Sequence, residues 1–103
     1  MENKCLVNDN QALVLAKFYQ IMADKTRLKI VYALIQKPLC VNEISNTVNM
    51  SQTAVSYQLK ILRTSRLVKY KRIGKKIIYS IEDDHVADII KISIEHLNHE
   101  SIK

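Results

Sequence analysis

Apolar residues recur every three or four positions along most of this chain, which is the spacing of one face of an α-helix. This pattern predicts a first helix over residues 11–23. A second predicted helix begins after Asp24, a residue type favoured at helix N-caps, and ends before Pro38, which lacks a backbone donor. The apolar faces contain Ala12, Leu15, Ala16, Tyr19 and Met22 in the first helix and Leu28, Val31 and Leu34 in the second.

Two shorter helical segments follow, and a tight turn separates them. Asn49 and Met50 are predicted to form the turn, and Ser51 is suited to cap the helix that follows it. Two short apolar helices joined in this way form a helix-turn-helix, predicted here over about residues 41–65. The inward-facing positions are Val41, Ile44 and Val48 in the first helix and Val55, Leu59 and Leu62 in the second.

The period then changes to alternation of apolar and polar residues, which is typical of a strand. Residues 67–73 alternate, and residues 76–81 resume a strand-like composition. Gly74, the single glycine, lies where a two-residue hairpin loop needs a positive φ. A basic hairpin directly after a helix-turn-helix is a wing, predicted over about residues 67–81. Helical spacing returns over residues 84–98, so we predict one mainly α domain over residues 1–103, a winged helix-turn-helix.

The composition limits the classes of protein that need to be considered. A chain of 103 residues with 48% hydrophobic content fits a single globular domain. No apolar run approaches the roughly 18 residues of a membrane span, and the first ten residues lack the apolar core of a signal peptide. Cys5 and Cys40 are too few for a disulfide framework. We therefore expect a cytoplasmic protein.

The net charge of +6 is distributed unevenly along the chain. Residues 60–76 are basic and contain no acidic residue, whereas residues 82–100 are acidic with Lys91 as their one basic residue. The first region is suited to phosphates and the second to a cation. The basic side chains are Lys60, Arg63, Arg66, Lys69, Lys71, Arg72, Lys75 and Lys76, and the acidic ones are Glu82, Asp83, Asp84, Asp88, Glu95 and Glu100.

The position of the basic region predicts binding to double-stranded DNA. In a helix-turn-helix, the N-terminal residues of the second helix reach base edges in the major groove. Glutamine can pair with adenine through two hydrogen bonds, and lysine or arginine on the wing can contact phosphates independently of sequence. The residues that we assign to DNA are Ser51, Gln52, Thr53, Ser56, Tyr57, Lys60, Arg63, Lys75 and Lys76.

A second candidate site lies in the last predicted helix. Asp83, His85, His96 and His99 form the pattern D-x-H, ten residues, H-x-x-H, and they include all three histidines. Carboxylate and imidazole are suitable ligands for zinc, and four of them complete a tetrahedral shell. His85 and His96 are eleven residues apart, or roughly 16 Å along one helix, so one helix cannot bring both to one ion. Two antiparallel copies can, and the motif therefore predicts a metal site and a dimer together.

The spacing along this helix supports the dimer. Five positions follow one stripe suited to packing against a second helix. Val86, Ile90 and Leu97 occupy an adjoining face that we expect to pack on the body of the same subunit. The stripe consists of His85, Ile89, Ile92, His96 and His99.

These motifs together resemble the ArsR/SmtB family of metal-sensing repressors, and the closing histidine pattern resembles its zinc- and cobalt-sensing (CzrA-type) members. The resemblance implies a bacterial homodimer, joined through its N- and C-terminal helices, that binds an operator without metal and releases it when zinc or cobalt binds. It also implies that Asp83 and His85 of one subunit share an ion with His96 and His99 of the other, and we expect His96 to relay the signal. The resemblance rests on residues 24–28, 39–41 and 51–60 and on the Gly74 wing.

Alternatives remain open from the sequence. A winged-helix repressor could lack a metal response and sense redox state through Cys5 and Cys40, or these cysteines could form a second metal site with Glu43. A structural zinc clamp that only stabilises the dimer is a further alternative. A zinc enzyme is disfavoured, because four protein ligands leave no position for a reacting water.

Overall fold

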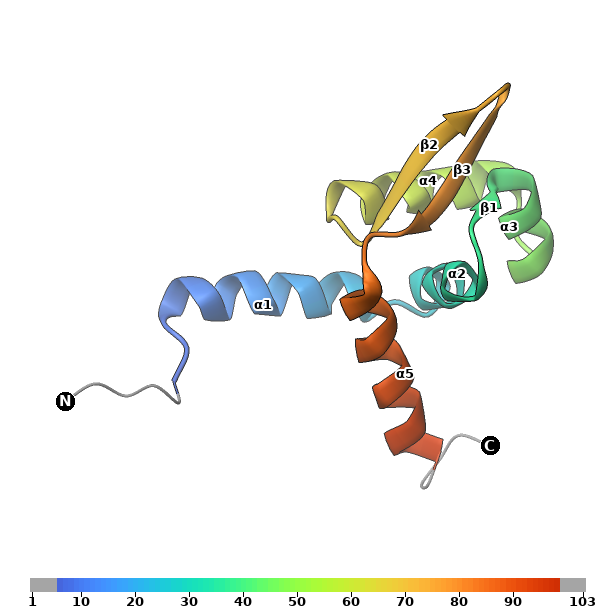
Figure 1. Cartoon of the computed structure of the whole chain (residues 1–103). Coiled ribbons are helices and arrows are strands. Elements are labelled where there is room, and N and C mark those ends of the chain that lie inside the picture. The colour runs from blue at the N-terminus through green and yellow to red at the C-terminus, as the bar shows by residue number, and fades with distance from the viewer. Residues whose placement is uncertain (1–5, 99–103) are drawn as a thin grey trace.

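The computed structural model describes residues 6–98 (Figure 1). Its helices and strands follow the predicted order, with one additional short strand. Two long helices, one at each end of this range, flank the compact part of the domain. In chain order the elements are α1 (Asp9–Met22), α2 (Lys25–Gln36), β1 (Leu39–Cys40), α3 (Val41–Val48), α4 (Gln52–Thr64), β2 (Val68–Ile73), β3 (Lys76–Ile81) and α5 (Asp84–Asn98).

The helix ends are set by local hydrogen bonds. Asp24 accepts a bond of 2.9 Å from the backbone N–H of Arg27, and Ser51 accepts one of 3.1 Å from that of Ala54, so both predicted caps are confirmed. Asn49 ends α3 in the left-handed conformation with φ of 59°. The first helix starts at Asp9, two residues earlier than its apolar spacing predicted, because Asn8 supplies a capping box.

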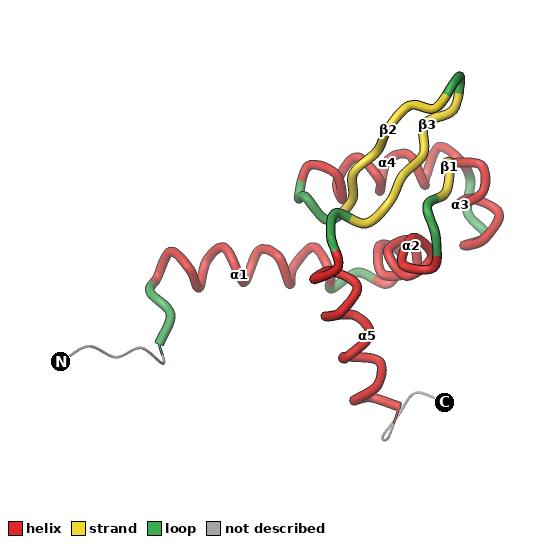
Figure 2. Tube along the Cα trace, viewed as in Figure 1, coloured by secondary structure: helices red, strands yellow, loops and turns green. Residues whose placement is uncertain are grey.

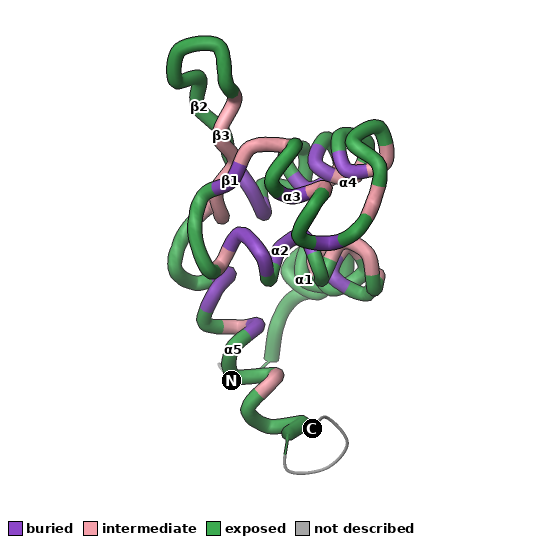
Figure 3. The backbone as a smooth tube through the Cα atoms, turned by 90° about the vertical axis from the view of Figure 1, so that its right-hand side faces the viewer, coloured by how far each residue is buried: buried purple, intermediate pink, exposed green. Residues whose placement is uncertain are grey.

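The core lies between α2, α3, α4 and the base of the hairpin (Figure 3). Its largest fully buried side chains come from every one of these elements, so the helix-turn-helix and the wing share one core. This common packing fixes the direction in which α4 presents its outer face. The residues are Ile30, Val31, Ile44, Val55, Leu59, Leu62, Leu67 and Val68.

The strands form a three-stranded antiparallel sheet in the order β1-β3-β2 (Figure 2). The long strands β2 and β3 form the predicted hairpin, and Gly74 has the expected positive φ, 63°. The strand β1 was not predicted, because two residues are too short to show a period. Leu39 pairs with Tyr79, and this pairing anchors the base of the wing to the chain between α2 and α3.

The two terminal helices extend away from this core (Figure 1). The described residues measure 57 × 32 × 21 Å, and only Met22 of α1 is buried. Val86 and Ile90 attach α5 to the core as predicted. Leu97 is 42% exposed, so the prediction that it packs on the body is wrong, because this last turn of α5 lies beyond the buried residues. Among the described residues, no helix is long and apolar enough to cross a membrane.

Candidate nucleic-acid interface and metal-binding helix

The outer face of α4 is polar and accessible. Gln52, Thr53, Ser56 and Tyr57 are exposed, as the sequence predicted, and Tyr57 is 64% exposed. The opposite face of α4 is buried in the core, and this packing prevents the helix from turning about its axis. Helix α4 therefore presents its N-terminal polar residues to solvent, where a partner can reach them.

The first two assigned residues of this surface also have structural contacts. The hydroxyl of Ser51 caps α4, as described above. Gln52 donates a hydrogen bond of 2.8 Å from Nε2 to Oδ1 of Asn42 on α3. Sequence reasoning missed Asn42, because a partner ten residues away on another helix leaves no signal in the local pattern. The two helices of the motif are thus linked at the edge that faces outward.

The wing carries its basic side chains in exposed positions. Lys75 lies in the loop, and Lys76 begins β3. Arg63, which was assigned to a phosphate, has its guanidinium 4.9 Å from the centre of the Tyr70 ring, a cation–π distance. The Tyr70 ring in turn lies 5.8 Å from that of Tyr79. Arg63 therefore links the end of α4 to the wing, a contact that the sequence did not predict. Lys60, the remaining basic residue assigned to DNA, is exposed on α4.

The half-buried Cys40 lies at the start of α3 and is held there by its backbone. Its N–H donates a hydrogen bond of 2.9 Å to Oε1 of Glu43. This bond, with a further contribution from the positive charges of Lys76 and Lys37, holds the pKa of Glu43 below its ordinary value. Cys5, the other predicted thiol, lies outside the described residues.

At the N-terminal end of α5, Asp83 and His85 lie side by side. The carboxylate oxygen Oδ1 of Asp83 is 3.4 Å from Nδ1 of His85. The side chain of Asp83 is 53% exposed and that of His85 is 90% exposed. The same oxygen accepts backbone hydrogen bonds of 2.9 Å from His85 and 3.3 Å from Val86. Asp83 therefore caps α5, a role that the sequence analysis did not assign to it.

The remaining histidines lie at the other end of α5. His96 is exposed in its last turn, and His99 lies outside the described residues. His85 and His96 are eleven positions apart on this helix, or roughly 16 Å. Within residues 6–98, no three potential ligands of the His, Cys, Asp or Glu type come together. The described part of one subunit thus has two candidate ligands at one end of α5 and one at the other.

The terminal helices expose apolar surface over much of their length. Leu13, Val14 and Leu15 on α1 and Ile92 on α5 are each about half exposed or more. Between α2, α5 and the end of α3 there is an open groove of about 1030 Å³, whose lining includes Leu28 and Ile94. Exposed apolar side chains that lie close together are typical of interaction surfaces.

A helix-turn-helix with a basic wing and an outward polar face on its second helix defines a winged helix-turn-helix DNA-binding protein. The family described as "Bacterial regulatory protein, arsR family" matches residues 24–70. The Transcriptional repressor SmtB homolog of Synechocystis sp. is 41% identical over 88 residues, which are 85% of this chain and 67% of that protein. The chain belongs to the ArsR family, whose members are DNA-binding transcriptional regulators and not enzymes.

Solved structures agree with this assignment. The solution structure of apo-NmtR superposes with a TM-score of 0.81 at 33% sequence identity, covering 100% of this chain and 87% of that one. The homodimeric winged helix-turn-helix DNA-binding domain Mb0332 of Mycobacterium bovis gives a TM-score of 0.76 at 27% identity, with 92% and 94% covered. The predicted fold class is thereby confirmed, and dimerisation of this chain is consistent with the homodimeric neighbour.

Proposed function

We propose that this chain is a metal-responsive transcriptional repressor whose homodimer binds operator DNA and releases it when Zn²⁺ or Co²⁺ binds between the subunits. Release would allow expression of metal efflux or resistance genes in the bacterial cytoplasm. The observation that carries the proposal is the pairing of Asp83 with His85 at one end of α5, while His96 is exposed at the other end. The ligand set is Asp83 and His85 of one subunit with His96 and His99 of the other.

The Asp83–His85 pair fits two ligands of one zinc ion. Two atoms bound to a tetrahedral ion by bonds of about 2 Å lie about 3.3 Å apart. The 3.4 Å between Oδ1 of Asp83 and Nδ1 of His85 matches that separation. Both side chains are largely exposed, so a further pair of ligands can approach them. When bound, the metal ion would supply a positive charge that holds the ligands of the two subunits together.

The exposed apolar side chains support pairing of two copies. An antiparallel arrangement of two α5 helices places the start of one helix beside the end of the other. Ile92, which is 65% exposed between the two ligand groups, would then be covered by the partner subunit. The exposed apolar residues of α1 extend the same interface, which gives the dimer a second helix from each subunit. The four ligands therefore meet only in the dimer.

The dimer connects the metal site to DNA through geometry. The two copies of α4 must match half-sites about 34 Å apart, one turn of the double helix. A ligand changes DNA affinity only if it favours one dimer arrangement over another. Residues that join the two α5 helices control the angle between the subunits and thereby the separation of the recognition helices. From the sequence, His96 is expected to relay the signal from a position near the body of its own subunit. In the structure His96 is exposed in the last turn of α5, so that position is not observed.

The names of the relatives support a repressor. The Synechocystis protein is named a transcriptional repressor, and a Staphylococcus aureus relative, 33% identical over 82 residues, is named a cadmium resistance regulatory protein. In this chain the acidic and histidine-containing α5 favours zinc or cobalt. Cys40 is held at the start of α3 by its backbone, and Cys5 lies outside the described residues, so no observed geometry favours a thiolate site.

Titration of Co²⁺ into the reduced, metal-free protein tests the proposed ligands. We expect intense tetrahedral d–d absorption that saturates at one ion per subunit without a thiolate charge-transfer band. Asp83→Asn should weaken binding and still cap α5, because asparagine is an equally good N-cap. Asp84→Asn is the matched control, one residue away, and should bind normally. A thiolate band would instead place the metal on Cys5 and Cys40, and no binding would leave a repressor without a metal response.

A further inference from the structure

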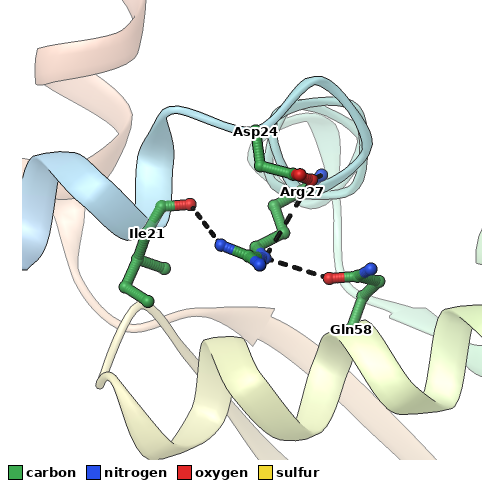
Figure 4. Close-up of polar contacts among 4 residues, drawn as sticks. All are labelled: Ile21, Asp24, Arg27 and Gln58. Atoms are coloured by element: carbon green, nitrogen blue, oxygen red, sulfur yellow. Dashed lines mark hydrogen bonds and ion pairs between the residues drawn. The ribbon is translucent and has the colours of Figure 1, made fainter.

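Arg27, on α2, contacts two other helices at once (Figure 4). Its Nε donates a hydrogen bond of 3.0 Å to Oε1 of Gln58 on α4. Its Nη1 donates one of 3.1 Å to the backbone carbonyl of Ile21, in the last turn of α1. The carboxylate of Asp24 lies 4.0 Å from the same Nε, which is an ion-pair distance. One side chain thus joins α1, the start of α2 and the recognition helix.

The surroundings of Arg27 separate it from the DNA-facing residues. Its side chain is only 20% exposed, and Gln58 and Ile21 are partly buried. Gln58 lies one turn from Val55 and Leu62, both fully buried, whereas the exposed DNA-facing residues occupy the other side of α4. A phosphate contact therefore does not account for this arginine.

The arginine fork is suited to holding two partners in fixed directions. A guanidinium is planar and presents five donors in a rigid arrangement, whereas a lysine is a single point of charge. The two acceptors lie on elements with different tasks. Helix α1 is an exposed apolar arm, and α4 carries the residues assigned to base edges. A change in the direction of α1 would move the acceptor of one Arg27 hydrogen bond and would thereby displace the guanidinium that also binds α4.

We propose that Arg27 is a positioning residue that couples the dimerisation arm α1 to the recognition helix α4 through Gln58. This inference rests on the proposed function, because it requires a dimer that binds DNA. In the dimer, the partner subunit fixes the direction of α1, and the Arg27–Gln58 hydrogen bond carries that direction to α4. The predicted result of breaking the link is weaker operator binding without loss of the dimer or of phosphate contacts.

The test begins with a duplex that the wild-type protein selects from a randomised pool. Fluorescence anisotropy then gives the affinity of each variant over a range of salt concentrations, and sedimentation gives the dimer dissociation constant. The variants are Arg27→Met, which keeps an unbranched stem, Gln58→Met and the double variant. Lys25→Met, two residues away and exposed, removes the same charge without touching Gln58 and serves as the control.

Each single variant should bind the selected duplex about tenfold more weakly, and the double variant no more weakly than either single variant, because both remove one link. The dependence of affinity on salt should match the wild type, since no phosphate contact is lost. The dimer dissociation constant should also be unchanged. Lys25→Met should bind like the wild type.

Three results would overturn the inference. Unchanged affinity in the folded fraction of Gln58→Met would show that the link is only structural, and this variant carries the test even where Arg27→Met unfolds. Additive losses would show that the two residues act independently. A salt slope reduced by about one in Arg27→Met would show a phosphate contact instead. A wild-type protein that selects no duplex contradicts the proposed function itself, which distinguishes that failure from this one.

Discussion

The amide nitrogen Nε2 of Gln52 donates a hydrogen bond of 2.8 Å to Oδ1 of Asn42. This contact fixes which way the amide of Gln52 points at the N-terminal end of α4. A glutamine amide has two N–H groups and one carbonyl oxygen, and the bond to Asn42 uses one of the N–H groups. The other N–H and the carbonyl are the pair that reads N7 and N6 of adenine. If Gln52 contacts a base as we propose, the bond to Asn42 would orient its amide for that contact.

The first prediction concerns base preference. Gln52→Ala should weaken operator binding about tenfold or more and relax the preference at one base pair in each half-site. Asn42→Ala should have a smaller effect at the same base pair, since the amide is present but no longer oriented. The affinity of each variant for a set of singly substituted operators measures its base preference at every position. Uniform weakening across all positions would contradict a role in base readout.

The second prediction concerns the wing. Replacing both Lys75 and Lys76 with alanine should weaken binding to specific and nonspecific DNA alike. The slope of log affinity against log salt should fall by about two, because each lysine neutralises one phosphate. Lys17→Ala, on α1, removes a charge far from the hairpin and should leave the slope unchanged. A slope that does not move would remove the wing lysines from the interface.

The third prediction concerns the dimer. Leu15→Asp should raise the dimer dissociation constant tenfold or more, because it places a charge in an apolar interface. The monomer should remain folded, since Leu15 is about half exposed and contributes little to the core. Lys17→Asp, on nearly the opposite side of α1, is the control. Sedimentation equilibrium measures the association, and an unaffected dimer would exclude this face of α1 from the interface.

The fourth prediction concerns acid stability. Glu43 has a lowered pKa in the folded protein because it accepts a hydrogen bond from the N–H of Cys40. The contribution of Glu43 to the stability of the folded protein is therefore complete above its ordinary pKa. It is lost as the pH falls through the lowered pKa. Glu43→Gln keeps an acceptor for the capping box and loses the charge, so its stability should fall less steeply with acid. Urea unfolding between pH 3 and 6 checks this, with Glu95→Gln on α5 expected to behave as the wild type.

Most of the fold followed from local signals in the sequence. The N-caps Asp24 and Ser51, the left-handed Asn49 and the hairpin Gly74 each act within a few residues, so their neighbours reveal them. The strand β1 did not follow, because the strand with which it pairs, β3, lies about forty residues later in the sequence. The exposure of Leu97 also did not follow, because helical spacing gives its direction and not where the core ends.

The candidate site was only partly predictable. The residue types on α5 and the outward face of α4 were readable from spacing alone. The contacts that orient these residues were not, since Asn42, Tyr70 and Arg27 act across different elements. Asp83 shows a further limit, because one carboxylate serves as a helix cap and as a candidate ligand. The pattern suggested the second role and did not reveal the first.

The most direct test of the central claim is the operator affinity of the metal-free dimer with and without saturating Zn²⁺, measured by anisotropy on the selected duplex. We predict that zinc weakens wild-type binding by at least tenfold, and that His85→Ala binds DNA normally but loses this response. Equal affinity with and without zinc, in a protein that binds the duplex, would contradict the account.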